Sequence, residues 1–413
     1  MKKYQYDVIV VGGGASGMMA AGTAAKRGKR VLLLERNLRL GEKLRISGGG
    51  RCNITNAERD QKKLLAHFGD AEQFLYSSFA QFGVDDTFSF FESRGLPLDV
   101  EANNRTFPHT RRAVDVVTAL EEYMSAYGVD VLKGVGVTAV NYAGDHITGV
   151  VCAGVTYTAE SYILSVGGVS HPETGSNGIG FTWLRELGHT VEEPTPTIVP
   201  LKVREKWVRD LSGITAPDAR VTFYLDGTKK FFKRGSILFT HFGLSGPTIL
   251  NLAGSVGDLL YEGEVTARID LFPDMDLGIL DRHIATVFDS HKNKLLRNVF
   301  REIVAPGMAD PLLAMLPQIN PETKVHSVRK EERRALATLC KELTLTVTGL
   351  MGFERAVVAD GGVLLSEVDT RSMRSKKYEN LFLTGDLLHI TRPSGGYSLQ
   401  LCWTTGYVAG THV

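Results

Sequence analysis

The feature that most constrains this chain is a glycine-rich turn near its N-terminus, set between a short apolar strand and a helix. Residues 7–11 form a β-branched run, which is typical of a strand buried on both faces. Three spaced glycines follow, then an alanine-rich stretch at 18–27 that indicates a helix, and then a second apolar run at 31–34. A strand, turn, helix and strand in this order predict a doubly wound α/β domain with a parallel sheet.

The three glycines have distinct steric roles. Gly12 permits the tight turn, Gly14 lets a pyrophosphate approach the backbone, and Gly17 lets the helix pack closely against the strand. A pyrophosphate would then meet free N–H groups at the positive end of the helix dipole. Glu35, at the end of the second strand, would accept hydrogen bonds from a ribose, which disfavours the 2′-phosphate of NADP. The motif therefore predicts a dinucleotide site, but by itself it does not separate FAD from NAD.

A second glycine-rich segment follows Glu35. Three consecutive glycines at 48–50 stand among three cations and an amide, namely Lys43, Arg45, Arg51 and Asn53. A backbone of this kind can lie against a flat ring or a phosphate. The alternative interpretation is a mobile surface loop.

The C-terminal part of the chain supplies a matching set of contacts. Residues 378–386 read as a buried strand ending in Gly385 and Asp386, and residues 395–400 open a helix that runs to about 409. A carboxylate at a strand end can hold a ribityl hydroxyl, and a helix N-terminus can stabilise negative charge at the N1–O2 edge of a flavin. NAD has no ribityl chain, so a site built from two such halves predicts FAD.

A strand at 162–168, which also ends in glycine, closes the first half of this domain. The candidate cofactor-binding residues are Gly12, Gly14, Ala15, Ser16, Gly17, Glu35, Arg36, Lys43, Ser47, Gly48, Gly49, Arg51, Asn53, Gly167, Gly385, Asp386, Gly395, Gly396, Tyr397, Ser398 and Leu399.

Three runs of the sequence, at residues 47–56, 238–247 and 395–400, resemble those of the BaiN/YhiN-type flavoproteins, also described as aminoacetone-oxidase-like NAD(P)/FAD-dependent oxidoreductases. The resemblance spans essentially the whole chain, and the first two runs are specific to the family. It implies bound FAD in a glutathione-reductase-like domain, with an inserted β-rich domain and a small helical domain. It also implies one of two activities: reduction of ring double bonds in 3-oxo bile acids, or oxidation of small amines.

The chain departs from the family pattern in several places. Asp386 replaces the usual Glu, and the usual Asp-rich stretch contains His389 and Arg392 instead. Ser398 replaces an Asn, and Ile179 replaces an Asp. The shorter carboxylate would shorten a ribityl contact and place His389 and Arg392 near the flavin, which marks a candidate subfamily with its own substrate.

A proline cluster at 194–196 predicts a domain boundary, because proline continues neither a helix nor an internal strand. Alternating short strands around an Asp226-Gly227 turn then indicate antiparallel hairpins. Helical periodicity follows from 277 to 343. We therefore predict a discontinuous FAD-binding domain at 1–195 and 345–413, an inserted β-rich domain at 196–275 and a helical subdomain at 276–344.

Four side chains are candidates for catalysis: His241, Tyr397, His389 and Cys52. His241 precedes a predicted helix at 248–260, at a strand-to-helix corner where it could protonate a carbanion, bind a carbonyl oxygen or merely tie down the corner. Cys52 lies beside Arg51, which would lower its thiol pKa, and it could link covalently to a flavin or simply pack. Tyr397 and His389 could donate protons near the ring or have structural roles.

Charge and cysteine usage argue against several other classes. The formal net charge is +1 and no basic stripe interleaved with aromatic residues is present, so neither nucleic acid nor a membrane is an expected partner. The four cysteines form no CxxC pair, which predicts neither a metal site nor a disulfide framework and suits the cytoplasm. Glycines interrupt the N-terminal apolar stretch, so we do not expect a signal peptide.

The leading hypothesis is an FAD-dependent oxidoreductase that reduces an activated C=C bond of a small molecule, such as a 3-oxo-steroid or dehydro-bile acid. No second GxGxxG turn with a matching strand and acid is present, so NAD(P)H would bind only transiently as electron donor. Two alternatives stay open: a flavin oxidase of small amines or amino ketones, and an RNA-associated flavoprotein.

Overall fold

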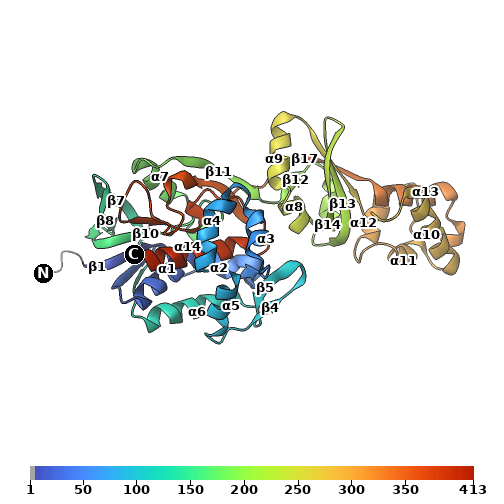
Figure 1. The fold of residues 1–413 in the computed structure, drawn as a ribbon. Coiled ribbons are helices and arrows are strands. Elements are labelled where there is room, and N and C mark those ends of the chain that lie inside the picture. The colour runs from blue at the N-terminus through green and yellow to red at the C-terminus, as the bar shows by residue number, and fades with distance from the viewer. Residues whose placement is uncertain (1–4) are drawn as a thin grey trace. The chain divides into compact units, whose positions relative to one another are not determined.

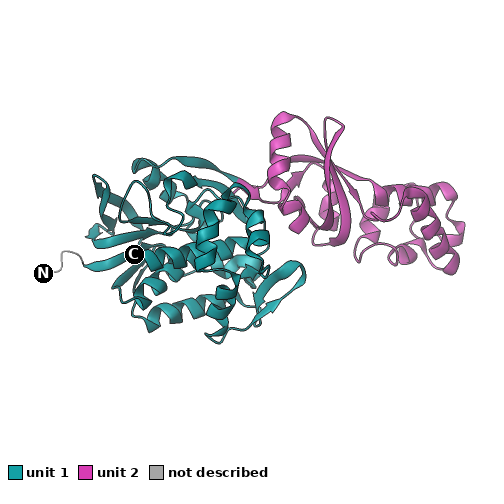
Figure 2. Cartoon of the chain, viewed as in Figure 1, with its two compact units in different colours: residues 1–195, 357–413 teal, residues 196–356 magenta. Residues whose placement is uncertain are grey.

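The computed structural model describes residues 5–413 and divides the chain into two compact units (Figure 2). Unit 1 contains residues 1–195 and 357–413, and unit 2 contains the inserted residues 196–356. Each unit has its own buried apolar core. The chain leaves unit 1 along β11 (Val191–Ile198) and returns along β18 (Val358–Val363), and these two strands pair with each other.

Unit 1 is built around a five-stranded parallel sheet with the order β19-β10-β1-β2-β6. Figure 1 labels its strands β1 and β10. Its strands are β1 (Tyr6–Val11), β2 (Val31–Glu35), β6 (Asp130–Lys133), β10 (Ala159–Leu164) and β19 (Leu381–Leu383). The central strands are continuously apolar because layers on both faces shield them from solvent. This is the doubly wound α/β sheet that the sequence predicts.

Helices and small antiparallel sheets surround this sheet. The helices are α1 (Ala15–Lys26), α2 (Glu42–Ile46), α3 (Gln61–Leu65), α4 (Glu72–Gln81), α5 (Val84–Glu92), α6 (Ala113–Ala126), α7 (Ile179–Glu186) and α14 (Tyr397–His412). One small sheet is β3 (Thr55–Asn56), β5 (Arg105–Pro108) and β4 (Leu98–Val100); the other is β7 (Val137–Ala143), β8 (His146–Cys152) and β9 (Val155–Tyr157). Among residues 5–413, no helix is both long and apolar enough to cross a membrane.

Helices α1 and α14 cross closely, because glycines on α14 face the backbone of α1. A Cβ added to Gly406 would collide with the carbonyl oxygen of Ser16, and one added to Gly410 would collide with that of Ala20. Residues four apart lie on one face of a helix, so the two glycines form a single flat contact surface. This crossing joins the beginning of the domain to its end.

Unit 2 is a closed antiparallel barrel with the order β12-β15-β14-β13-β16-β17. The strands are β12 (Leu201–Val203), β13 (Thr215–Leu225), β14 (Thr228–Thr240), β15 (Gly243–Ser245), β16 (Val265–Asp270) and β17 (Leu343–Leu350). Its helices are α8 (Pro247–Leu250), α9 (Ala253–Glu262), α10 (Leu277–Ser290), α11 (Leu296–Phe300), α12 (Ala309–Ala314) and α13 (Lys330–Lys341). The predicted hairpin around Asp226 and Gly227 joins β13 to β14.

The structure differs from the sequence prediction at three points in unit 2. Strand β17 pairs with β12 and β16 and closes the barrel, so unit 2 ends at 356 and the FAD domain resumes at 357 rather than at 345. The helical segment between β16 and β17 shares one core with the barrel. The predicted helix at 248–260 is broken into α8 and α9 near Asn251, where Asn251 and Gly254 have low helix propensity.

Candidate functional site

The turn between β1 and α1 has the steric character that its glycines predict. Gly12 has a φ of +104°, and a Cβ there would lie 2.5 Å from the carbonyl oxygen of Ser165. A Cβ on Gly17 would collide with the carbonyl oxygen of Gly12, so only glycine allows the helix to start this close to the strand. A Cβ on Gly14, in contrast, would meet nothing within 4 Å. The space in front of Gly14 is open for a ligand.

The N-terminus of α1 is free to bind an anion. Gly14 is its N-cap, no side chain accepts a hydrogen bond from its first turn, and that turn contains no acidic residue. The first N–H groups of a helix have no intrahelical partner and carry the positive end of the dipole. Ala15 and Ser16 therefore carry free backbone donors at this helix end, and their contact with a pyrophosphate stays a prediction.

Glu35 supports the turn from the end of β2. Its carboxylate accepts the N–H of Gly13 at 2.6 Å and that of Asn37 at 2.7 Å, and burial raises its pKa. A carboxylate has about four acceptor positions, so Glu35 keeps acceptor capacity beyond these two backbone contacts. The exposed Arg36 reaches the carbonyl oxygen of Gly175 at 3.4 Å, beyond the end of this strand.

The segment after α2 forms an open glycine surface. Gly48, Gly49 and Gly50 have φ values of +57°, +67° and +83°, a left-handed run that other residues adopt only at a cost. A Cβ on Gly49 or Gly50 would meet nothing within 4 Å. The hydroxyl of Ser47 donates to the carbonyl of Leu44 at 2.7 Å and fixes the start of the run. The backbone here is thus exposed and held in place.

Arg51 and Asn53 attach this loop to the β4–β5 hairpin. The Asn53 side-chain oxygen accepts the N–H of Thr106 at 3.2 Å. The Arg51 guanidinium lies 4.3 Å from the centre of the Phe107 ring and pairs with Glu101 at 3.5 Å. Both predicted cofactor contacts therefore have protein partners of their own.

The environment of Cys52 differs from the one expected from the sequence. The side chain is fully buried, and burial raises the pKa of its thiol to about 12. The expectation that Arg51 lowers this pKa is therefore wrong, because the guanidinium stacks on Phe107 instead. Almost no thiolate exists at neutral pH, and of the two alternatives the structure favours the packing role.

The C-terminal half of the site meets the N-terminal half at Gly385. This residue follows β19 with a φ of +62°, and a Cβ there would lie 3.0 Å from the Ser16 hydroxyl of α1. Its N–H donates to the Thr405 hydroxyl of α14 at 3.0 Å. Gly167, at the end of β10, has a φ of +74°. We call the α1 N-terminus, Glu35, Gly385, Asp386 and the α14 N-terminus together the cofactor cradle.

Asp386 is held between two cations. Its carboxylate pairs with Lys43 at 3.2 Å and with Arg392, and Lys43 also donates to the Ser170 hydroxyl at 2.5 Å. Burial alone would raise the pKa of Asp386, but Lys43 and Arg392 outweigh burial and hold it at about 2. Lys43 and Arg392 share the single carboxylate of Asp386, so these three residues together carry a net positive charge.

Arg392 connects this cluster to α14. It is only 3% exposed, and it donates to the Ser398 hydroxyl at 3.0 Å and to the Ile390 carbonyl at 2.7 Å. Ser398 lies in the first turn of α14, whose N-cap Gly396 has no capping side chain and is followed by no acidic residue. The positive end of the α14 dipole and the net positive charge of Lys43, Arg392 and Asp386 thus lie together at the N-terminus of α14.

A buried hydrogen-bond network fixes the start of α14. The Gln400 side-chain oxygen accepts from the hydroxyls of Thr55 at 2.6 Å and Thr87 at 2.9 Å. A Cβ on Gly396 would collide with the backbone of Thr55. The Gly395 carbonyl accepts the side-chain amide of Asn56 at 3.3 Å, and Leu399 is half-buried. Three further residues, Gln400, Thr405 and Ser170, were not predicted from the sequence, where their polar side chains among apolar neighbours were the available signal.

Tyr397 and His389 lie in unit 1 with the cradle. The Tyr397 ring is 7% exposed and packs against His67 at 4.9 Å and Phe68 at 5.9 Å between ring centres, and burial raises its pKa. Among residues 5–413, the Nδ1 atom of His389 is buried and has no hydrogen-bond partner, while the backbone N–H of His389 donates to the Val363 carbonyl at 3.0 Å. Their predicted role as proton donors stays a prediction.

His241 lies in unit 2, in a setting that differs from the prediction. It is exposed in the tight turn between β14 and β15, with its ring 4.9 Å from that of Phe242. The expected strand-to-helix corner is wrong, because β15 intervenes before α8 begins at Pro247. Its catalytic role also stays a prediction.

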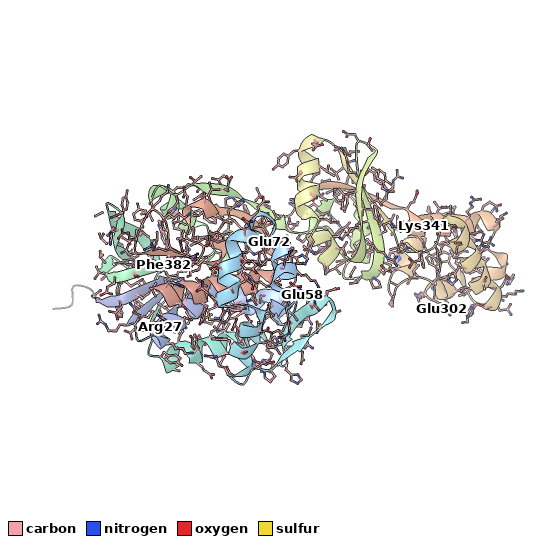
Figure 3. The ribbon with its side chains drawn as sticks, viewed as in Figure 1. Arg27, Glu58, Glu72, Glu302, Lys341 and Phe382 are labelled. Carbon is pink, nitrogen blue, oxygen red and sulfur yellow. The ribbon has the colours of Figure 1, made fainter. Side chains whose placement is uncertain are left out.

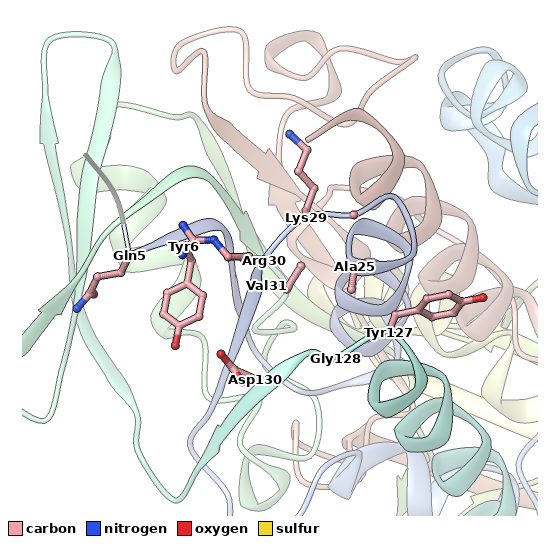
Figure 4. Close-up of a pocket in the computed structure, with 10 residues that line it drawn as sticks. Gln5, Tyr6, Ala25, Lys29, Arg30, Val31, Tyr127, Gly128 and Asp130 are labelled. Atoms are coloured by element: carbon pink, nitrogen blue, oxygen red, sulfur yellow. The ribbon is translucent and has the colours of Figure 1, made fainter. Parts of the chain in front are cut away.

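A cavity of about 360 Å³ lies away from the cradle (Figure 4). Its lining includes Tyr6, Arg30 and Asp130, which stand at the beginnings of β1, β2 and β6. In a parallel sheet, nucleotides bind beyond the opposite, carboxyl ends of the strands. This cavity is therefore not part of the cofactor cradle.

The cradle and the sheet define the class of protein. A glycine turn with open space, an uncapped helix, an acid ending the second strand and a returning C-terminal helix form the FAD-binding version of the Rossmann fold. The chain is an FAD-dependent oxidoreductase. It belongs to the HI0933-like family, since the model of the HI0933-like protein Rossmann domain matches residues 6–412. The match confirms the family resemblance of the sequence motifs.

Two relatives match along nearly the whole chain. A 3-dehydro-bile acid delta(4,6)-reductase of Clostridium scindens is 30% identical and covers 97% of each chain. A ribosomal RNA dihydrouridine synthase of Escherichia coli is 27% identical and covers 98% of this chain and 96% of the relative. The solved 3-ketosteroid-delta4-(5alpha)-dehydrogenase of Rhodococcus jostii RHA1 has a TM-score of 0.56 at 14% identity, covering 99% and 97%. That last likeness shows the fold alone.

Proposed function

We propose that the protein is an FAD-dependent reductase of a C=C bond conjugated with a carbonyl group, with a 3-oxo-steroid or dehydro-bile acid as its first candidate substrate. The observation that carries the proposal is the meeting of Gly385 with Ser16, which completes one cradle from two distant segments. The bile acid reductase relative, which covers 97% of each chain, supports the substrate class.

Each part of the cradle has a defined task in this proposal. The backbone N–H groups at the start of α1 bind the pyrophosphate, and Glu35 accepts the ribose hydroxyls. Asp386 accepts a ribityl hydroxyl through the lone pairs that Lys43 and Arg392 leave free. The net positive charge beside the α14 N-terminus stabilises negative charge on the flavin edge. FAD held in the cradle would supply, in its reduced form, a hydride to the carbon β to the carbonyl, and a transiently bound NAD(P)H would restore its two electrons.

The reaction also needs a proton at the α carbon, for which the candidates are His389, Tyr397 and His241. His389 retains an unpartnered Nδ1, whereas the Tyr397 ring is packed and its pKa is raised. Replacement by His389→Gln, Tyr397→Phe and His241→Gln separates them. Loss of a general acid is expected to slow substrate reduction by about 100-fold or more, without a change in the visible flavin spectrum.

Anaerobic stopped-flow measurement tests the reaction. The purified protein is reduced and then mixed with a 3-oxo-Δ4-steroid, and we expect flavin reoxidation to be faster than in buffer. The corresponding saturated 3-oxo-steroid is the control, since it lacks the double bond and cannot accept the hydride. Equal rates with both steroids and with buffer would overturn the substrate assignment. Peroxide formation from a small amine under air would instead favour the oxidase alternative.

A second candidate substrate is a uracil ring in RNA. Dihydrouridine is uridine with its 5,6 double bond reduced, and that bond is also conjugated with a carbonyl, so the same hydride chemistry applies. The Escherichia coli relative supports this candidate. The observation that favours it is an exposed surface of unit 2 on which Phe232 and Tyr224 lie beside cationic side chains.

A further inference from the structure

The barrel of unit 2 carries aromatic and cationic side chains on its outer surface that the proposed redox chemistry does not use. Every second residue of β13 from Val221 to Leu225 is buried inside the barrel. Because side chains alternate along a strand, the residues between them, including Arg220 and Tyr224, face outward. Strand β13 runs between β14 and β16, so outward-facing groups of three strands form one surface.

Aromatic and cationic side chains alternate on this surface. On β14, Phe232 is 55% exposed, and its ring lies 5.6 Å from Arg220 and 5.1 Å from Lys229. On β16, the guanidinium of Arg268 lies 4.6 Å from the centre of the Tyr224 ring. Tyr224 is the pairing partner of Lys229, which brings the two ring–cation sets next to each other. We call these five residues the outer face.

Lys229 and Arg268 of the outer face are exposed, whereas Arg220 is half-buried and donates to the Pro273 carbonyl at 3.2 Å. No carboxylate in residues 5–413 forms a salt bridge with Arg220, Lys229 or Arg268. The nearby carboxylates already have partners: Asp270 pairs with Lys341 at 2.6 Å (Lys341 is labelled in Figure 3), and Asp218 with Arg234 at 2.6 Å. An anionic partner would therefore meet unneutralised charge.

We infer that the outer face is a docking surface for single-stranded RNA. Exposed aromatic rings stack on unpaired bases of any sequence, and cations between them contact the phosphates. A protein partner fits less well, because protein interfaces place an apolar centre inside a polar rim. The linear sequence hides this surface because its residues come from three strands. The inference rests on the second candidate substrate of the proposed function and deepens it, because it names the surface that would hold the RNA.

Fluorescence anisotropy with the oxidised holoprotein and a labelled 12-nucleotide oligouridylate tests the inference over a series of KCl concentrations. We expect Phe232→Ala to weaken binding by about tenfold and to leave the salt dependence unchanged, since stacking does not displace counterions. Lys229→Gln is expected to reduce the slope of log affinity against log salt by about 0.7, the value for one phosphate on a single strand.

Matched controls come from the same unit. Tyr261 is 92% exposed on α9, outside the outer face, and Lys324 is exposed in the helical part, so Tyr261→Ala and Lys324→Gln are expected to change affinity less than twofold. The flavin absorbance, which reports on unit 1, verifies that each variant is loaded. The inference is overturned if the wild type does not bind at 50 mM KCl, if Phe232→Ala binds normally, or if duplex RNA binds as tightly. Because no turnover is involved, failure here is distinct from failure of the steroid assay.

Discussion

Helices α1 and α14 both begin at a glycine without a capping side chain, yet their surroundings differ. Gly14 faces open space, whereas Gly396 is pressed against Thr55. At α14, Arg392 and Asp386 add fixed charges to the helix end. The difference indicates that backbone donors and open space at α1 are sufficient for a pyrophosphate. The flavin ring, whose charge changes on reduction, requires ionised groups beside it at α14.

The steric requirement at the start of α1 is tested by Gly17→Ala. The added methyl group would collide with the carbonyl oxygen of Gly12, so α1 could start only by moving away from β1. We expect the free energy of unfolding of the FAD-free protein to fall by more than about 3 kcal/mol. Urea unfolding followed by circular dichroism measures it, and a loss below about 1 kcal/mol would show that the turn can relax.

The charge cluster at α14 is tested by Arg392→Gln. This change leaves Asp386 with Lys43 alone in a buried site, and breaking a buried pair costs about 3 kcal/mol. Arg204→Gln is the control, because its pair with Glu264 is exposed and contributes at most about 1 kcal/mol. If both variants unfold at the same urea concentration, the buried cluster does not stabilise the fold.

The same cluster predicts a pH effect. The pKa of Asp386 is about 2 in the folded protein and ordinarily 3.8, so its ionised form stabilises the fold above about pH 4. That contribution, about 2 kcal/mol, is lost as pH falls from about 4 to about 2. Arg392→Gln is expected to raise the pKa of Asp386, so the variant should lose less stability than the wild type between pH 5 and pH 3. Urea titrations of both proteins at the two pH values measure this difference. An unchanged difference would contradict the assignment.

The α1–α14 crossing is tested by Gly406→Ala, which we expect to cost about 2 kcal/mol because its methyl group meets the backbone of Ser16. The matched control is Gly254→Ala in α9, where the nearest atom lies 4.0 Å away. There alanine should stabilise the helix by up to about 1 kcal/mol. Thermal unfolding of the two variants should therefore shift in opposite directions, and shifts of the same sign would refute close packing.

The smallest effect on stability is expected for Gly14→Ala. Gly14 has a φ of −80° and open space at its Cβ, so alanine fits without strain and the FAD-free stability should change by less than about 0.5 kcal/mol. The methyl group would nevertheless occupy the approach of the pyrophosphate, so FAD affinity should fall at least about tenfold. Fluorescence titration with FAD measures this loss. Unchanged affinity would place the cofactor elsewhere.

Features fixed by a residue's own backbone preference could be predicted from the sequence. Gly12 and Gly17 sit where no side chain fits, and that requirement appears directly as glycine at fixed spacing. The buried strand at 7–11 and the hairpin at Asp226 were predictable for the same reason, since pattern and turn chemistry are local.

Features that depend on tertiary neighbours could not be predicted in this way. Ser170 and Asp386 meet at Lys43, but they lie 127 and 343 residues from it in sequence. The thiol pKa of Cys52 followed burial rather than its neighbour Arg51, and burial is set by the whole domain. The outer face likewise exists only once β14, β13 and β16 have paired.

The α1–α14 crossing has a consequence for biosynthesis. The ribosome makes α1 first and reaches α14 only after the whole of unit 2. At about 5–20 residues per second, roughly 20–70 s separate the two helices. During that interval the nascent chain has an unfinished pocket and an uncovered apolar helix. Tight retention of the yellow cofactor must therefore follow translation, and messages with premature stop codons before α14 would yield colourless protein.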